Sequence, residues 1–151
     1  RTKIYLPFLQ NFADSQKVSI SRAELIIKVD DIVSPASPFY ESPAELALIA
    51  CNADGVEELV WDQLETTDFV KYGGEYDATN KQYTFNIARQ VQKILNGTVA
   101  NNGFYLVNAL PNRSYVIRRD NRLNRVVIGG KTNANFKPVF KVTYVKFPYD
   151  K

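Results

Sequence analysis

Two runs of alternating apolar and polar residues, near opposite ends of the chain, constrain the fold more than any other feature. In SRAELIIKVD (residues 21–30), every second side chain is apolar: Ala23, Leu25, Ile27 and Val29. In KPVFKVTYVKF (residues 137–147), the same pattern recurs at Phe140, Val142 and Tyr144. A period of two places successive side chains on opposite faces of a strand. Both runs therefore predict half-buried strands of an antiparallel sheet.

Further short strands are predicted between these two runs, separated by loops and turns. The strand-like segments are KIYLPFL (3–9), AELALIACN (44–52), KQYTFNI (81–87), GFYLVNAL (103–110) and NRVVIGG (124–130). Three prolines between Pro35 and Pro43 predict a loop, and NADG (52–55) predicts a turn. The paired glycines of YGGEY (72–76) and IGGKTN (128–133) predict tight turns after strands.

One segment has helical period. In NIARQVQKILNG (86–97), apolar residues recur at i, i+4, i+7 and i+8, which predicts a helix over about residues 86–96. Asn86 is the expected N-cap, and Gly97 stands where a left-handed residue ends a helix.

Taken together, these elements predict an all-β chain with one short helix. Seven or eight short strands with long connections are typical of a jelly-roll-like antiparallel β-sandwich. The 151 residues suffice for a single domain over 1–151 with its own core. Because the chain starts without Met at Arg1, we expect it to be the C-terminal part of a longer protein.

Charge is divided unevenly along the chain. Residues 1–75 hold six Lys/Arg against thirteen Asp/Glu, a net charge of −7, whereas residues 76–151 hold thirteen against three, a net charge of +10. A sandwich built from both halves would place acidic and basic strands side by side. Internal pairing is therefore the expected role of the division, rather than binding to nucleic acid.

The composition excludes several catalytic classes. The chain has no histidine, which removes Ser-His-Asp and Cys-His catalysis and histidine-based metal sites. The single cysteine, Cys51, allows no internal disulfide and is expected to be a small buried side chain. No phosphate-binding loop is present.

The acidic stretch VEELVWDQLETTD (56–68) leaves a glycosidase open as an alternative, because such enzymes need two carboxylates across a cleft. Its candidate carboxylates are Glu57, Glu58, Asp62, Glu65 and Asp68, with Trp61 as a surface for a sugar ring. A solvated acidic face and a core tryptophan are the expected structural roles. We expect no enzymatic activity.

No cofactor is expected, although a structural calcium ion is possible where oxygen ligands gather. Those ligands would be Asn52, Asp54, Asp77 and Asn80. Asx turns explain both segments without a metal, and they are the preferred interpretation.

Five arginines crowd one segment: Arg113, Arg118, Arg119, Arg122 and Arg125. Guanidinium groups bind phosphate, sulfate or uronate through paired hydrogen bonds, so Arg118, Arg119 and Arg122 are candidate anion-binding residues. Asp120 interrupts the run and Tyr115 is its one aromatic residue, which argues against nucleic-acid binding. Pairing with the acidic first half is the structural alternative.

Aromatic side chains near loops offer a second candidate site. Phe39, Tyr40, Tyr72 and Tyr76 could stack on sugar rings in a carbohydrate-binding module. Such a module should present two or more of them on one rim.

Three motifs resemble one known family in the same order. They are SISRAELIIKV (19–29), YTFNIARQVQKILNG followed by NNGFYLV (83–107), and RVVIGG followed by KPVFKVTYVK (125–146). Together they resemble the Bacteroidetes outer-membrane lipoproteins that share domain of unknown function 4270. DNRLNR (120–125) is also loosely similar to the motif of the DNRLRE-type jelly-roll modules, some of which are regarded as carbohydrate-binding.

The resemblance implies a lipoprotein at the outer membrane or cell surface, anchored by a lipid on a cysteine upstream of Arg1. Its motifs are structural rather than catalytic. The expected function is therefore a non-catalytic binding or structural module whose partner is an outer-membrane or surface protein. A glycan partner is the alternative, membrane contact is expected only through the lipid anchor, and no nucleic-acid partner is expected.

Overall fold

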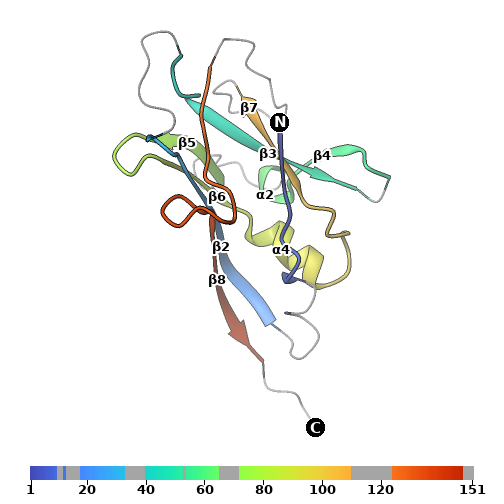
Figure 1. Ribbon diagram of the computed structural model, residues 1–151. Helices are drawn as coiled ribbons and strands as arrows, with labels where there is room; N and C mark the ends of the chain where they lie inside the picture. The colour runs from blue at the N-terminus through green and yellow to red at the C-terminus, as the bar shows by residue number, and fades with distance from the viewer. Residues whose placement is uncertain are drawn as a thin grey trace.

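The computed structural model describes residues 1–9, 12, 18–32, 40–52, 54–64, 72–109 and 124–147. These residues form eight strands and two short helices (Figure 1). The strands are β1 (Thr2–Ile4), β2 (Val18–Lys28), β3 (Glu45–Cys51), β4 (Glu57–Leu59), β5 (Gly73–Asp77), β6 (Gln82–Asn86), β7 (Phe104–Ala109) and β8 (Val139–Lys146). The helices are α2 (Trp61–Leu64) and α4 (Ala88–Leu95).

The strands form one antiparallel sheet that curls strongly into a half-barrel (Figure 1). Their order is β1-β7-β3-β5-β6-β2-β8, and β4 pairs with β3 beside this path. The expected all-β antiparallel architecture is confirmed at this level. The expected two separate sheets are instead two halves of one sheet, joined by the pairing of Glu45 in β3 with Glu75 in β5.

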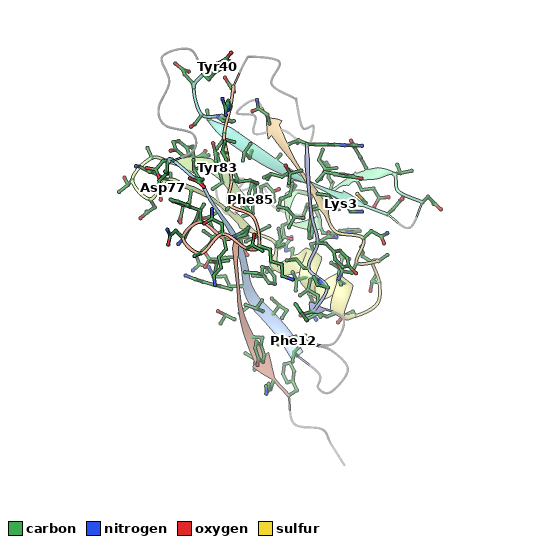
Figure 2. The ribbon with its side chains drawn as sticks, in the orientation of Figure 1. Lys3, Phe12, Tyr40, Asp77, Tyr83 and Phe85 are labelled. Carbon is green, nitrogen blue, oxygen red and sulfur yellow. The ribbon has the colours of Figure 1, made fainter. Side chains whose placement is uncertain are left out.

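The core lies between the two halves, as the alternation predicted. Ala23, Leu25 and Ile27 of β2 are at most 1% exposed. They join one apolar cluster with side chains from β3, β6, β7 and α4, among them Tyr83 and Phe85 (Figure 2). Cys51 is buried at the end of β3, as expected for a small apolar side chain.

The Gly73–Gly74 pair lies inside β5, where the two halves of the sheet meet, and not in the tight turn that was predicted. Both residues have a positive φ, +88° and +102°. A Cβ added at Gly74 would collide with the carbonyl oxygen of Leu46 in β3, and one at Gly73 with the carbonyl oxygen of Thr84 in β6. These glycines let three backbones approach closely, and the β5–β6 register shifts between Gly73 and Tyr76.

The predicted helix exists as α4, with a different start. Ile87 occupies the N-cap position without a side-chain hydrogen bond, so the prediction that Asn86 caps the helix is wrong. Asn86 ends β6 instead, and its Oδ1 accepts from the Ala23 N–H at 3.4 Å. At the other end Gly97 has φ +70°, as predicted. The N–H groups of Gly97 and Thr98 donate to the carbonyls of Ile94 and Lys93, which satisfies the last turn.

The segment NRVVIGG departs from its prediction. Instead of a strand it forms one isolated bridge, between Ile128 and Val29, the residue that follows β2.

Candidate functional site

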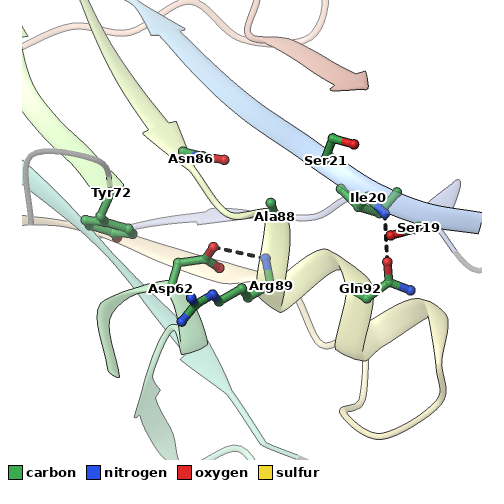
Figure 3. Close-up of a pocket in the computed structure, with 9 residues that line it drawn as sticks. All are labelled: Ser19, Ile20, Ser21, Asp62, Tyr72, Asn86, Ala88, Arg89 and Gln92. Carbon is green, nitrogen blue, oxygen red and sulfur yellow. Dashed lines mark hydrogen bonds between the residues drawn. The ribbon is translucent and has the colours of Figure 1, made fainter. Parts of the chain in front are cut away.

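A cavity of about 380 Å³ opens between β2, α4 and Tyr72 (Figure 3). It is lined by Ser19, Ile20, Ser21, Asp62, Tyr72, Asn86, Ala88, Arg89 and Gln92. The cavity lies where β6 ends and α4 begins. The residues of β2 that precede Glu24 have α4, and not a strand, on the side away from β8. This local incompleteness of the sheet creates the space.

Asp62 forms the wall of the cavity at the start of α4. Its Oδ1 accepts from the Arg89 N–H at 3.0 Å, and its Oδ2 accepts from the Gln90 N–H at 2.9 Å. The Gln90 Oε1 in turn accepts from the Trp61 N–H at 3.1 Å. The first turns of α2 and α4 therefore cap each other, and Asp62 has the role that was predicted for Asn86.

Tyr72 forms another wall and is held by β3. Its hydroxyl accepts from the Leu48 N–H at 3.1 Å and lies 3.5 Å from the Leu48 carbonyl oxygen, to which it donates. On the side of β3 away from β7, β5 pairs at Glu45 and β4 pairs from Ile49 onward, so no described strand pairs with Leu48 there. The tyrosine hydroxyl thus replaces a neighbouring strand for one residue of β3.

Gln92 completes β2 in the same way. Its Oε1 accepts from the Ile20 N–H at 2.8 Å (Figure 3), and its Nε2 donates to the Val18 carbonyl at 3.2 Å. A side-chain amide here reproduces the hydrogen bonds of a strand partner.

Burial sets the electrostatics of the cavity. Asp62 is 8% exposed, and this desolvation raises the pKa of its carboxyl group. The N–H groups of Arg89 and Gln90 and the charge of Arg89 act in the opposite direction. Burial also raises the pKa of the Tyr72 hydroxyl well above its ordinary value. Tyr72 is therefore a neutral hydrogen-bonding group at physiological pH.

Of the four candidate sugar-stacking aromatics, the structure describes Tyr40, Tyr72 and Tyr76. Tyr72 is 4% exposed, so its ring is unavailable for stacking. Tyr76 is half-buried with its ring centroid 5.1 Å from that of Tyr83. Tyr40 is 46% exposed. Phe39 lies outside the described residues.

Most of the arginine segment, including Arg113, Arg118, Arg119 and Arg122, also lies outside the described residues. Arg125 is exposed, and its backbone N–H donates to the Glu41 carbonyl at 3.1 Å. Within the described part of the chain, Lys81 of the basic half forms an ion pair with Asp31 of the acidic half. The predicted pairing of the arginines with the acidic half stays a prediction.

The described carboxylates of the acidic stretch have structural partners. Glu57 pairs with Arg1, and Glu58 accepts from the Asn52 Nδ2 at 2.9 Å. The Lys93 ammonium lies 3.8 Å from the centroid of the Trp61 ring. Asp62 alone among these carboxylates lines the cavity, while Glu65 and Asp68 lie outside the described residues.

Both segments that could have held calcium form Asx turns, which was the preferred interpretation of their sequences. The Asn52 Oδ1 accepts from the N–H groups of Asp54 and Val56, at 3.0 and 2.9 Å. The Asp77 Oδ1 accepts from the N–H groups of Thr79 and Asn80, both at 3.0 Å. Among the described residues no group of three or more Cys, Asp or Glu could hold a metal ion.

A second candidate surface is the edge formed by β8. This strand pairs with β2 on one side and is last in the strand order. Its far end projects from the body of the molecule (Figure 1). Val145 and Phe147 are each 52% exposed there, beside the exposed Lys146.

The structural roles of Tyr72, Gln92 and Asp62 were not predicted from the sequence. Each acts on a backbone far away along the chain, 24, 72–74 and 27–28 residues distant. The local signal of a polar contact at the start of α4 is the position of Gln90, three residues after Ile87 and four before Ile94 on the apolar face of the helix, where the side chain is buried.

No protein-family model, curated protein or solved structure matches the chain. Within the described part of the chain, no helix has both the length and the apolar character needed to span a membrane.

Proposed function

We propose that this chain is a non-catalytic binding module of a bacterial surface lipoprotein, and that it docks a protein partner along β8. The observation that supports this most directly is the edge of β8, which pairs with no further strand among the described residues and has exposed apolar side chains at its projecting end. An unpaired strand edge is a template for a strand from another chain.

The backbone of β8 is oriented for such pairing. The Ala23 carbonyl of β2 accepts from the Ile87 N–H at 2.8 Å, and so faces away from β8. Ala23 lies opposite Val142 in the β2–β8 register. In an antiparallel pair, two residues that lie opposite each other either point their backbone N–H and C=O groups toward each other or both point them away from the pair. The N–H and C=O of Val142 therefore face outward, toward a partner strand.

Side chains on β8 indicate the chemistry of that partner. Lys141 and Lys146 are exposed, and Val145 and Phe147 add apolar surface. A partner segment with acidic residues between apolar ones would complement this pattern. Edge lysines also deter pairing between copies of the same strand, which favours a different protein as the partner.

The remaining parts of the proposal concern anchoring, activity and the finer fold. We propose a lipid anchor at the outer membrane, supported by the sequence resemblance. The proposed absence of catalytic activity is supported, among the described candidate carboxylates, by the structural roles of Glu57, Glu58 and Asp62. The half-barrel is interpreted as a jelly roll whose two four-stranded halves stay joined at β3 and β5.

Site-specific photo-cross-linking in the native cell tests the docking. A photoreactive residue at Val145 of the full-length protein should yield one dominant cross-linked partner, and the same residue at Thr79, in the turn between β5 and β6, should yield none. Reversing the charge with Lys141→Glu and Lys146→Glu should abolish the product. The matched control, Lys131→Glu with Lys137→Glu, should retain it. Equal cross-linking from Val145 and Thr79, or none from either, would refute docking at β8.

A further inference from the structure

We propose that the cavity between β2 and α4 binds a small, neutral, polyhydroxylated molecule of about monosaccharide size. The inference goes beyond protein docking and concerns a different part of the molecule, since no residue of β8 lines this cavity.

The cavity has the dimensions and rigidity of a preformed site. Its 380 Å³ falls at the lower end of the range for small-molecule pockets, about 300–1,000 Å³. Three of its walls are held by hydrogen bonds described above: Asp62 at the start of α4, Tyr72 at Leu48, and Gln92 at Ile20. A ligand would therefore bind without ordering these groups.

The polar groups around the cavity match hydroxyl groups. Ser19 and Ser21 are exposed on β2, and neither hydroxyl has a hydrogen-bond partner among the described residues. Asn86 uses its Oδ1 for the Ala23 N–H, which leaves its amide N–H groups as donors. Each Asp62 oxygen accepts one N–H from α4 and retains a second lone pair. Donors and acceptors are thus interleaved, as a molecule with several hydroxyls requires.

The charges favour a neutral ligand over an ion. Asp62 occupies the N–H groups at the start of α4 that would otherwise attract an anion. The positive charge of Arg89 acts on Asp62 and reduces its attraction for a cation. Ile20 and Ala88 add small apolar surfaces between the polar groups, which suits the C–H groups of a sugar or polyol.

Saturation-transfer NMR and thermal unfolding of the chain test the assignment. The probes are six neutral sugars (glucose, galactose, mannose, fucose, xylose and N-acetylglucosamine), with sodium phosphate and methylammonium chloride as charged probes. We expect at least one neutral sugar to bind with a Kd on the order of 1 mM and to raise the Tm. Its methyl glycoside should also bind if the natural ligand is the end of a glycan, and should not if it is a free reducing sugar.

Two matched variants locate the binding. Ser21→Trp fills the cavity from an exposed position on β2 and should weaken binding by more than about tenfold. Thr143→Trp places the same side chain at an exposed position on β8 and should leave the affinity unchanged. The proposal is overturned if no neutral sugar binds, if Ser21→Trp has no effect, or if phosphate or methylammonium is the probe that Ser21→Trp displaces.

Discussion

At the scale of single residues, three polar side chains satisfy backbone groups that the sheet leaves unpaired. Tyr72 serves Leu48 in β3, Gln92 serves Val18 and Ile20 in β2, and Asp62 serves the start of α4. Buried backbone groups need such partners because an unsatisfied one costs about 1–3 kcal/mol. These residues therefore hold the two halves of the sheet and both helices together.

Tyr72→Phe removes the hydroxyl and leaves both backbone groups of Leu48 without a partner. We expect the free energy of unfolding to fall by about 1–3 kcal/mol, with the urea m-value unchanged. Tyr40→Phe is the control, because Tyr40 is 46% exposed and its change should be within about 0.5 kcal/mol. Equal stability of the two variants would show that the hydroxyl of Tyr72 has no structural role.

Asp62→Ala leaves the N–H groups of Arg89 and Gln90 uncapped. The expected cost is about 2 kcal/mol, measured by urea unfolding at neutral pH. Asp62→Asn retains one acceptor and should cost less. A larger loss in the Asn variant than in the Ala variant would contradict the capping role.

The same carboxylate makes stability depend on pH. Burial raises the pKa of Asp62 above its ordinary value of 3.8, so the folded state binds the proton more tightly than the unfolded chain. The stabilisation of the folded state by the protonated Asp62 is fully present below the pKa of the unfolded chain, and it is lost as the pH rises through the pKa of the folded state. The stability of the wild type relative to Asp62→Asn should therefore increase as the pH falls from neutral to about 4. A constant difference between the two proteins over this range would exclude the coupling.

At the scale of elements, β5 determines how the sheet curls, because Gly73 and Gly74 bring its backbone against β6 and β3. Gly74→Ala places a methyl group on the Leu46 carbonyl at φ +102°. We expect a loss of about 3 kcal/mol or more in urea unfolding. Gly130→Ala is the control, since an added Cβ there meets no atom within 4 Å and should change stability by less than about 0.5 kcal/mol. An unchanged free energy of unfolding in Gly74→Ala would mean that β3 and β5 can move apart to make room for the methyl group.

Most strands and α4 were predictable because their signals are local. The alternation of β2 and β8 and the helical period of Ile87, Val91 and Ile94 lie within single segments. The joint at Gly73 and Gly74 was not, because two glycines fit a tight turn and a strained strand equally well. The cavity was not predictable either, since Ser21, Asp62 and Arg89 come from three segments that only the tertiary fold brings together.

At the scale of the whole molecule, β2 is the most protected strand. Residues Glu24–Lys28 pair with β6 on one side, and Glu24–Ile26 also pair with β8 on the other. We expect the slowest amide hydrogen exchange at Leu25 and Ile27, whose side chains and register partners Phe85 and Tyr83 are buried. The fastest exchange among the strands is expected at β1 and β4, which have three register pairs each. Faster exchange at Leu25 than at Lys3 would show that the sheet does not unfold from its edges.

The placement of β1 and β8 at the two edges of the sheet has a mechanical consequence. In Figure 1, β1 leads away from the start of the chain and β8 leads toward its end along a similar direction, so tension between the two ends loads both strands along their length. The eight register pairs between β8 and β2 then resist the pull together, whereas β1 shares three with β7. Under load the molecule should yield first at β1 and keep the β2–β8 ladder intact.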